Sequence, residues 1–448
     1  MRIDTGDTAW VLVSAALVMF MTPGLALFYG GLVRAKNVLG TVMQSLIALG
    51  VVTVLWVLVG YSLVFGSDHG LLTGGLEYLG LRGVGADPTA LAPSVPASAF
   101  MVFQMMFAVI TPALITGAFA ERMRFGGYLL FLGLWSLLVY VPVAHWVWGG
   151  GFLGAAGVGA LDFAGGTVVH VNAGAAALAT ALYLGRRRGF GTGALRPHNV
   201  PMVLLGAGIL WFGWFGFNAG SALSAGGLAS SAFVATHLGA AGGMLGWLVP
   251  ERLRHERATT IGAATGAIAG LVAITPASGY VAPLPALAIG LAAGVVCFLA
   301  VELKGRLRLD DSLDVVGVHM VGGIVGALLT GVFASLAVNP AGADGSLAQV
   351  ARQAAAIGVT LCFSFLATMA ILRLVDRTVG LRVSEDVEEE GLDRSIHGES
   401  AYAWSDRTDG TRTLPFDPDA ELAKLREQLV VEATRRTVQA LKQPDPLD

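Results

Sequence analysis

Two histidines lie in runs that carry no charged side chain. His170 stands in GGTVVHVNAG, residues 165–174, and His319 stands in VVGVHMVGG, residues 315–323. In each case an aspartate, Asp162 or Asp311, precedes the histidine by eight residues. An imidazole has an ordinary pKa of about 6.5 and can hold or pass a proton, but its charged form is poorly solvated among apolar side chains. The repeated spacing predicts two related sites that handle a proton while the rings stay neutral overall.

Aromatic side chains recur at steps of three and four in two segments, so that each set shares one helix face. The first set is Phe103 and Phe107, and the second is Trp214, Phe217 and Ser221. Trp148 stands directly before three glycines at the end of another apolar run. A tryptophan face attracts a cation by roughly 0.5–2 kcal/mol, and a serine hydroxyl can accept a hydrogen bond from it. The pattern predicts two aromatic helix faces that point to a common place and have the chemistry to attract a cation, with an interfacial tryptophan anchor and plain helix packing as the alternatives.

The two aspartates have a simpler interpretation than cation binding. Each lies about two turns before its histidine and therefore near the N-terminal end of a helix. A carboxylate in that place can accept hydrogen bonds from free backbone N–H groups and is stabilised by the helix dipole. We therefore expect Asp162 and Asp311 to give structural support.

The composition places these residues in a membrane protein. Apolar residues make up 55% of the 448-residue chain and charged residues only 13%, whereas soluble proteins have about 25% charged residues. The 61 glycines are spread through the apolar segments, which suits helices that pack closely in lipid. The net charge of −3 gives no reason to expect a nucleic-acid partner.

Eleven apolar stretches are long enough to cross about 30 Å of hydrocarbon. They lie near 9–31, 38–66, 98–120, 127–148, 165–185, 200–222, 227–250, 258–276, 281–303, 315–337 and 351–372. Basic residues fall on alternate connections, namely Arg34, Lys36, Arg122, Arg124, Arg186, Arg187, Arg188, Arg196, Arg252, Arg254, Arg257, Lys304, Arg306 and Arg308. By the positive-inside rule this alternation predicts an N-terminus outside the cell and a C-terminus inside.

The first ten predicted helices form two related sets of five. AVITPALITG at 108–117 is echoed by VAITPASGY at 272–280, and the two Asp/His pairs have the same spacing. Because five is odd, the halves at about 8–186 and 199–337 must cross the membrane in opposite senses, as in transporters with inverted repeats. We expect an all-α membrane domain over residues 1–375, with the histidines near mid-membrane, the eleventh helix outside the repeat, and a cytoplasmic tail over 376–448.

In their order along the chain, the motifs resemble those of the ammonium transporters of the Amt/Mep/Rh family, the bacterial Amt branch in particular. The resemblance runs from about residue 8 to 403. Its motifs include PGLALFYGGLVRAKNVL, FQMMFAVITPALITGAFAERMRF, VAHWVWGGGFL, LDFAGGTVVHVNAG, WFGWFGFNAGSA and DDSLDVVGVHMVGGIVG. It implies a homotrimer in the cytoplasmic membrane, with one path per subunit that carries ammonium inward, and no enzymatic activity, metal or cofactor.

The resemblance also implies roles for single residues. Phe107, Trp148 and Ser221 match the outer recruitment site, with Phe103 beside them, and Phe107 and Phe217 match a stacked gate. Trp214 matches a pore-lining aromatic, and His170 and His319 match the twin histidines of the pore. The counterpart of Asp162 supports the recruitment site without touching the ion.

Three alternatives remain open on the sequence. His170 and His319 could be axial ligands of a haem in a membrane redox protein, or the chain could be an ammonium sensor with the transporter fold. An Rh-like gas channel agrees less well with Trp148 and Ser221. The other two histidines within predicted helices, His145 and His237, lack symmetric partners, and we expect them to be hydrogen-bonded packing residues.

The polar C-terminal segment begins with SEDVEEEGLDRSIHGESAYAW, residues 384–404. The family resemblance implies that this segment packs under the trimer and helps to dock a PII-type signalling protein. Beyond it, Leu422, Leu425 and Leu429 lie at helical spacing and predict an extra amphipathic helix near 417–442, to which the sequence assigns no role.

Overall fold

The computed structural model describes residues 2–68, 70, 72–192 and 195–402 and is helical almost throughout. The helices are α1 (Thr5–Leu32), α2 (Val38–Leu55), α3 (Tyr61–Phe65), α4 (Ala97–Phe119), α5 (Phe125–Trp135), α6 (Val141–Trp148), α7 (Asn172–Leu184), α8 (Val200–Gly220), α9 (Gly227–His255), α10 (Thr260–Ile274), α11 (Pro283–Arg306), α12 (Val321–Phe333), α13 (Leu347–Thr378), α14 (Glu385–Glu390) and α15 (Leu392–His397). An antiparallel hairpin of β1 (Pro88–Thr89) and β2 (Ala92–Pro96) lies between α3 and α4.

Ten helices within the described residues are long and apolar enough to cross a membrane, which makes the chain a multi-pass membrane protein. They are α1, α4, α8, α9, α11 and α13, together with the composite helices Ala35–Phe65, Phe125–Trp148, Gly166–Leu184 and Val316–Phe333. The eighth predicted crossing, near 258–276, is the shorter helix α10. At 1.5 Å per residue its 15 residues span about 22 Å, so the count of eleven crossings remains a prediction.

Each composite helix contains a π-helical turn. The four turns are Trp56–Gly60, Ser136–Tyr140, Gly166–Val171 and Val316–Met320. A π-helical turn inserts an extra residue into the helix and redirects the side chains on it, and such turns are frequent at functional sites. The last two turns carry His170 and His319, so both histidines stand where their helices depart from regular geometry.

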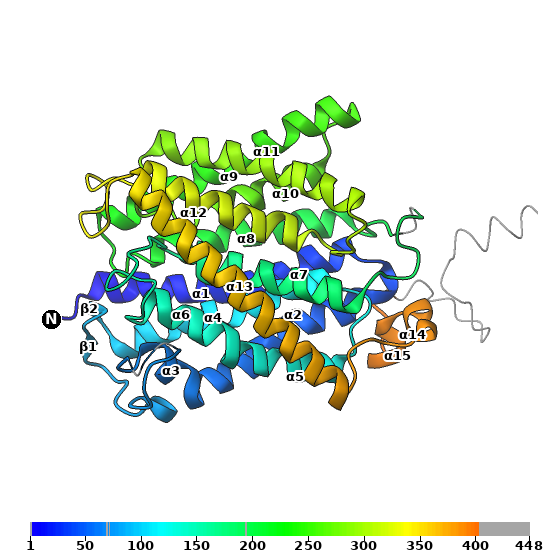
Figure 1. Ribbon diagram of the computed structural model, residues 1–448, viewed down its shortest axis with the longest axis horizontal. Coiled ribbons are helices and arrows are strands. Elements are labelled where there is room, and N and C mark those ends of the chain that lie inside the picture. The colour runs from blue at the N-terminus through cyan, green and yellow to red at the C-terminus, as the bar shows by residue number, and fades with distance from the viewer. Residues whose placement is uncertain (1, 69, 71, 193–194, 403–448) are drawn as a thin grey trace, which may run out of the picture. The chain divides into compact units, whose positions relative to one another are not determined.

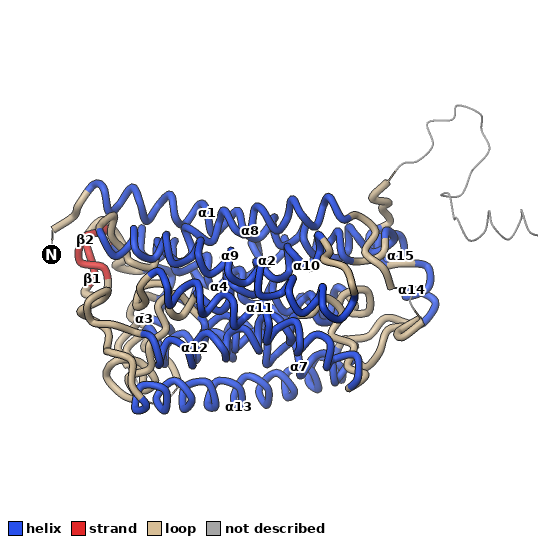
Figure 2. The backbone as a smooth tube through the Cα atoms, turned by 90° about the horizontal axis from the view of Figure 1, so that it is seen from above, coloured by secondary structure: helices blue, strands red, loops and turns tan. Residues whose placement is uncertain are grey.

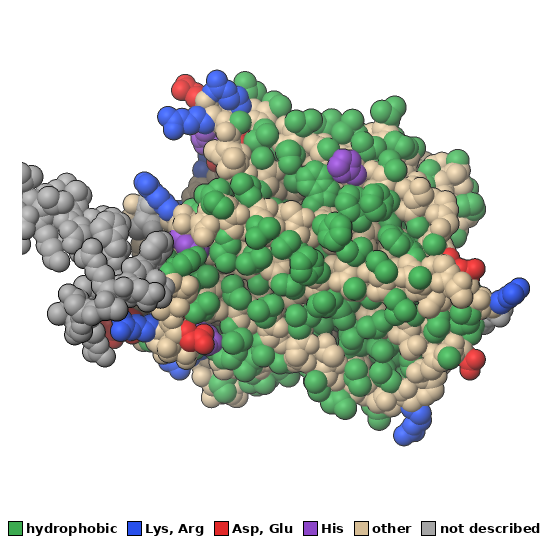
Figure 3. All heavy atoms as spheres, turned by 180° about the vertical axis from the view of Figure 1, so that it is seen from behind, with side chains coloured by type: hydrophobic (Ala, Val, Ile, Leu, Met, Phe, Trp, Pro, Cys, Tyr) green, Lys and Arg blue, Asp and Glu red, His purple; other side chains and the backbone are tan. Residues whose placement is uncertain are grey.

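The long helices run side by side, as Figures 1 and 2 show. The most extensive contacts are those of α1 with α8 and of α9 with α10 and α11. The β1–β2 hairpin lies at the end that carries the N-terminus, and α14 and α15 lie at the opposite end (Figure 1). Figure 3 shows hydrophobic side chains across the middle of the face seen from behind, with most of its charged side chains at the two ends. This distribution suits a protein surrounded by lipid.

Residues 381–399 of the predicted tail pack against the connections after α1 and α4 and against the start of α2. The backbone N–H of Arg124 donates to the carbonyl of Leu381 at 2.7 Å, and Lys36 Nζ donates to the carbonyl of Glu389. The Asp393 carboxylate accepts the N–H of Gly40 at 2.8 Å near the start of α2. This part of the tail therefore belongs to the same compact unit as the long helices, which ends at Glu399. The predicted helix near 417–442 lies outside the described residues.

Candidate functional site

His170 and His319 lie in direct contact at the centre of the protein. Their Nδ1 atoms are 3.2 Å apart, and their rings stack at 22° with centroids 5.3 Å apart. The exposed fractions of the two residues are 1% and 4%. Because a hydrogen bond needs one donor and one acceptor, two neutral rings satisfy this contact with a single shared hydrogen. Nε2 of His170 is buried without a hydrogen-bond partner and is free to meet a ligand.

The backbone at the start of each histidine-bearing turn binds the aspartate that precedes the histidine by eight residues. The Asp162 carboxylate accepts the backbone N–H groups of four residues at 2.6–3.0 Å, namely Gly165, Gly166, Thr167 and Val168. Asp311 accepts those of Val315 and Val316 at 3.1 and 2.7 Å. Both aspartates thus serve the free N–H groups at a helix start, as the sequence predicts.

Burial governs the ionisation of both aspartates. It raises the pKa of Asp162 above its ordinary value, although the backbone donors oppose this effect. Burial also raises the pKa of Asp311 to about 6, with the nearby Lys304 charge acting in the other direction. Neither carboxylate lines the cavities described below. The contacts of both carboxylates are with backbone N–H groups, so they support the start of each helix.

Two glycines allow the histidine-bearing helices to cross. Gly174 and Gly323 each lie four residues after a histidine. A Cβ added to Gly174 would stand 2.5 Å from the backbone N and Cα of Met320, and one added to Gly323 would stand 3.0 Å from the carbonyl oxygen of Gly166. Because real Cβ atoms essentially never approach another heavy atom to 2.5 Å, a side chain at Gly174 would force the helices apart. The close contact of the two imidazoles depends on this crossing.

An open cavity lies on the side of the β1–β2 hairpin. Its lining is Phe65, Leu91, Phe100, Gln104, Phe107, Val147, Trp148, Phe163, Ser221 and Leu223. The Trp148 Nε1–H donates to the carbonyl of Asp162 at 2.9 Å, which fixes the indole ring. Ser221 Oγ donates to the carbonyl of Phe217 at 2.8 Å, so its remaining lone pairs can accept a hydrogen bond. Among the lining residues that the structure describes, the cavity offers an aromatic face and a hydroxyl acceptor but no charged side chain.

Two phenylalanines separate this outer cavity from the histidines. The ring centroids of Phe107 and Phe217 are 4.4 Å apart, and Phe107 stands edge-on to Trp148 at 5.7 Å. Both phenylalanines are almost completely buried. Phe103 lies elsewhere than expected for a recruitment residue: it is fully buried, does not line the outer cavity, and packs edge-on behind Phe107 at 5.0 Å. The next residue, Gln104, lines the outer cavity instead.

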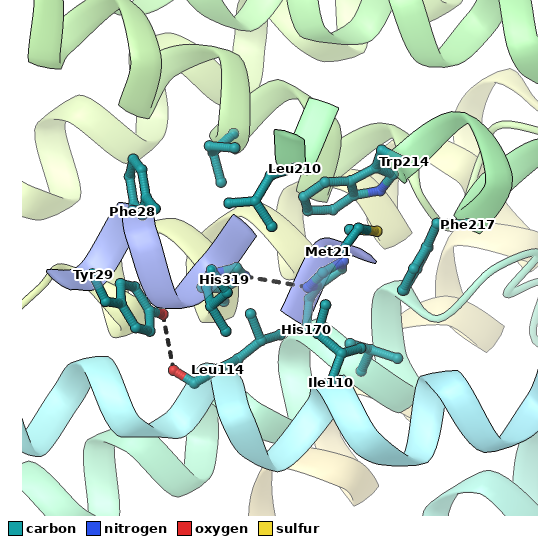
Figure 4. A pocket seen from close by; sticks show the side chains of 13 residues that line it. Met21, Phe28, Tyr29, Ile110, Leu114, His170, Leu210, Trp214, Phe217 and His319 are labelled. Carbon is teal, nitrogen blue, oxygen red and sulfur yellow. Dashed lines mark hydrogen bonds between the residues drawn. The ribbon is translucent and has the colours of Figure 1, made fainter. Parts of the chain in front are cut away.

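The inner cavity holds the histidine pair in apolar surroundings, as Figure 4 shows. Its other lining residues are Met21, Leu25, Phe28, Tyr29, Ile110, Leu114, Val169, Leu210, Trp214, Phe217 and Ile268. Trp214 stacks on His170 at 5.4 Å, and its Nε1–H donates to Thr275 Oγ1 at 2.8 Å. The hydroxyl of Tyr29 is engaged with the carbonyl of Leu114 at 2.9 Å. These apolar walls give a hydrated cation almost nothing to replace its water.

Most lining residues were not identified from the sequence, although a periodic signal is present. Phe100, Gln104 and Phe107 lie on one face of α4, and Met21, Leu25 and Phe28 lie on one face of α1. Both sets follow the spacing i, i+4, i+7. The same spacing marks ordinary helix packing, so only the position of the histidines and Trp148 distinguishes a lining face from a packed one.

His145 and His237, the two other histidines that the sequence predicts within helices, differ from each other. His145 is fully buried, with Nδ1 at 2.7 Å from the carbonyl of Val64 and Nε2 at 3.2 Å from Asp68 Oδ1, as expected for a hydrogen-bonded packing residue. His237 departs from that expectation, because it is exposed and its ring packs against Trp211 at 5.4 Å. It lies on the outward face of α9, away from the two cavities.

A buried charge network lies beside the start of the tail. Arg187 pairs with Asp310 at 2.8 Å and with Glu121 at 3.3 Å, and Arg34 pairs with Glu121 at 2.9 Å. Burial alone would raise the pKa of both carboxyls, but the arginine charges and hydrogen bonds outweigh it and leave both pKa values below their ordinary range. The network ties together the connections that follow α1, α4, α7 and α11.

The geometry of the histidine pair does not suit axial ligation of a haem. With metal–imidazole bonds of about 2 Å, two axial nitrogens would be about 4 Å apart on opposite faces of the porphyrin. Here the Nδ1 atoms are hydrogen-bonded to each other at 3.2 Å, which leaves no space for a ring between them.

The chain resembles known proteins over most of its length. The model of the Ammonium Transporter Family matches residues 9–402. An ammonium transporter of Mycobacterium tuberculosis is 52% identical over 432 residues, covering 89% of this chain and 90% of that protein. The crystal structure of Candida albicans Mep2 superposes with a TM-score of 0.81 at 38% identity, covering 86% and 87% of the two chains. A structure described as a sensor Amt protein gives a TM-score of 0.80 at 30% identity, covering 87% and 97%. This is a family of membrane transporters rather than enzymes, and the chain belongs to it.

Proposed function

We propose that the protein carries ammonium inward across the cytoplasmic membrane, by recruiting NH4⁺ in the outer cavity and passing NH3 along the histidine pair. The observation that carries the proposal is the position of that pair. His170 and His319 lie hydrogen-bonded to each other in an apolar cavity, directly below an aromatic gate and an open outer cavity.

Recruitment uses the groups that line the outer cavity. NH4⁺ is a small cation with four N–H donors, so it can lie against the faces of Trp148 and Phe107 and donate to Ser221 Oγ. Because the Ser221 hydroxyl hydrogen is engaged with Phe217, its oxygen presents lone pairs and no hydrogen to the ion. A potassium ion shares the cation–π attraction but cannot donate hydrogen bonds.

Selectivity follows from loss of a proton rather than from size. Below the Phe107–Phe217 gate the walls are apolar and cannot replace the hydration shell of an ion. Ammonium avoids most of this cost by giving up a proton and continuing as neutral NH3. The unpartnered Nε2 of His170, in the tautomer that carries no hydrogen there, takes up the proton of NH4⁺ or accepts a hydrogen bond from the resulting NH3.

A relay of the released proton through the imidazole pair would make transport electrogenic. The 3.2 Å contact between the Nδ1 atoms allows the shared hydrogen to move from one ring to the other, while the outer nitrogens take up and release protons. Each passage moves one charge inward and leaves both rings in the opposite tautomer, so both rings must exchange tautomers before the next proton can follow.

We further propose the assembly and topology that the family resemblance implies. These are a homotrimer with one path per subunit, an inverted repeat of five helices, an N-terminus outside and a C-terminus inside. The similar Asp–His–Gly arrangements at Asp162 and Asp311 support the repeat. The packing of residues 381–399 against the connections after α1 and α4 supports a cytoplasmic face where a PII-type protein docks. The PII proposal fails if a cognate PII protein neither co-purifies with the trimer nor inhibits uptake under nitrogen-replete conditions.

Current recordings on proteoliposomes test the transport proposal. On a solid-supported membrane, an ammonium concentration jump should give a saturable inward current that an equal potassium jump does not give. Liposomes without protein are the control. Uptake of ammonium without current would refute the relay, and neither uptake nor current would refute transport.

A sensor is the second candidate function, and the similarity to the sensor Amt protein favours it. Growth separates the two candidates. If the chain is a transporter, its gene should restore growth on low ammonium to a strain that lacks its own ammonium transporters. A sensor should leave that growth defect in place although the protein is present in the membrane.

A further inference from the structure

Two buried glutamines of α13 hold the loop that leads to Asp162. Gln353 Oε1 accepts the backbone N–H of Leu161 at 2.6 Å, and its Nε2 donates to the carbonyl of the same residue at 2.7 Å. One turn earlier, Gln349 Nε2 donates to the carbonyl of Gly159 at 3.0 Å. Each glutamine is 1% exposed. The two side chains bind the loop backbone much as a neighbouring strand would.

Gln353 also joins this loop to the helix that carries the second histidine. Its Nε2 donates to the carbonyl of Ala327 in α12 at 3.2 Å, and its Oε1 accepts a bond from Gln349 at 3.2 Å. All the polar atoms of the Gln353 side chain are therefore engaged. A buried amide costs free energy unless its hydrogen bonds are made, so a fully satisfied one specifies a single arrangement of the groups around it.

The next residue along the loop transmits this arrangement to the outer site. Asp162 follows Leu161 directly. Its carbonyl accepts the Trp148 Nε1–H, and its carboxylate holds the first N–H groups of the turn that carries His170. A shift of the Leu161 backbone would therefore move the indole ring as well as the start of that turn. The chain of contacts runs from Gln353 through Leu161 and Asp162 to Trp148.

We propose that Gln353 is a positioning residue for the outer site. Through it α13, the helix outside the predicted repeat, sets the position of Trp148 over the outer cavity. The inference rests on the proposed recruitment of ammonium there. Gln353 touches no lining residue of either cavity in the contacts described, so its effect is transmitted through the loop.

The ammonium concentration that gives half-maximal current is the quantity to measure. In proteoliposomes, Gln353→Leu removes both bonds to Leu161 and should raise this concentration at least about threefold, the loss expected when a cation–π contact is misplaced. The maximal current and the preference for ammonium over potassium should stay within about twofold. Gln353→Glu keeps an acceptor for the Leu161 N–H but loses the amide donor, and should shift the concentration in the same direction by less.

Thr368→Val is the matched control. Thr368 is a fully buried residue of the same helix that accepts the Trp135 Nε1–H at 3.0 Å, far along the chain from the loop. This variant also removes one buried hydrogen bond of α13, so it should lower the unfolding temperature without changing the half-maximal concentration. Should Gln353→Leu fail to fold, the Gln353→Glu variant decides the question in the same assay.

Combining the substitutions at Gln353 and Trp148 gives a measurement that a merely structural role of Gln353 would not change. Trp148→Leu should itself raise the half-maximal concentration, and adding Gln353→Leu to it should cause little further change. If both glutamine variants leave that concentration at its wild-type value, or if Gln353→Leu has the same effect with and without Trp148, the inference is wrong. If Trp148→Leu alone changes nothing, the outer site itself fails, which is a different outcome.

Discussion

The Nδ1 atoms of His170 and His319 lie 3.2 Å apart, although 149 residues separate the two histidines in the chain. Each stands on a π-helical turn, and the aspartate eight residues before each histidine accepts the first N–H groups of that turn. A glycine four residues after each histidine lies at the helix crossing. The contact thus depends on two similar supports that meet at one point. Because Trp214 and Phe217 both stack on His170, the pair keeps a fixed position relative to Phe107 and Phe217, whose rings also contact each other.

Replacing either histidine of the pair with alanine should abolish or greatly reduce the ammonium current. His170→Ala and His319→Ala remove one ring of the only imidazole contact seen in the inner cavity of the described structure, so a proton can no longer pass between two rings. If the space left by the ring fills with water, the pore should conduct potassium instead. Ammonium and potassium currents measured side by side on each variant test this prediction.

The recovery of folded protein in gel filtration, at the elution volume of the proposed trimer, is the control for that experiment. A pair that only holds the two helices together would give poor recovery and leave the selectivity of the surviving protein unchanged. Wild-type currents with wild-type selectivity in both variants would contradict the proposed role.

Removing the Asp162 side chain should destabilise the protein more than it changes the ion preference. Asp162→Ala leaves four backbone N–H groups without their acceptor, and each unsatisfied buried group costs about 1–3 kcal/mol. Asp162→Asn keeps one acceptor oxygen and should lose roughly half as much stability. Unfolding temperatures of the two variants in detergent give the comparison, and equal values for alanine and wild type would show that the carboxylate is not a support.

The sequence predicts the histidine pair and its aspartates better than it predicts the residues that line the two cavities. The equal Asp–His spacing locates the two histidines and their supports because both halves of the chain repeat one pattern. The steps from Trp214 to Ser221 predict one shared helix face. In the structure Trp214 and Phe217 of α8 lie on the inner lining, and Ser221, which directly follows α8, lies on the outer one. These signals concern neighbours on one helix or repeated motifs, which spacing can reveal.

Contacts between distant segments leave no such signal. Nothing in the spacing of Gln353 indicates its bonds to Leu161, 192 residues earlier, and the π-helical turns have no composition of their own. Phe103 and Phe107 share a face by spacing, yet only Phe107 reaches the outer cavity, because Phe103 is turned into the packing behind it. The length of α10 was also missed, since the apolar run around it continues into the turns after Ile274.

Acid should weaken the buried charge network of Glu121, Arg187 and Asp310. Both carboxyl pKa values lie below their ordinary range in the folded protein, so at low pH the unfolded chain binds more protons than the folded one. The stabilisation is therefore fully present above about pH 4–4.5, the ordinary range of Asp and Glu, and is lost as the pH falls through the lowered values. Unfolding temperatures measured between about pH 3 and pH 7 should therefore fall as the pH drops below about 4–4.5.

Glu121→Gln gives the matched variant for the acid experiment. It removes the carboxylate charge that pairs with Arg34 and Arg187, which should lower the free energy of unfolding by about 3–5 kcal/mol at neutral pH. Its unfolding temperature should depend less on pH below about 4.5, because one of the two titrating carboxyls is gone. A variant that keeps the full acid dependence of the wild type would show that other carboxyls are responsible.

A methyl group at the crossing of the two histidine-bearing helices should separate the imidazoles without altering either of them. In Gly174→Ala the new Cβ would stand 2.5 Å from the backbone of Met320, the residue next to His319, and backbone atoms cannot turn aside as a flexible side chain can. The helices must therefore move apart, at a cost of about 1–3 kcal/mol for an overpacked contact, and the 3.2 Å bond between the Nδ1 atoms lengthens.

Gly358→Ala in α13 is the control, because its Cβ would meet nothing within 4 Å. We expect the ammonium current to fall sharply in the first variant and to persist in the second, with trimer recovered from both. An undiminished current in Gly174→Ala would mean that transport does not require the direct contact of the two rings.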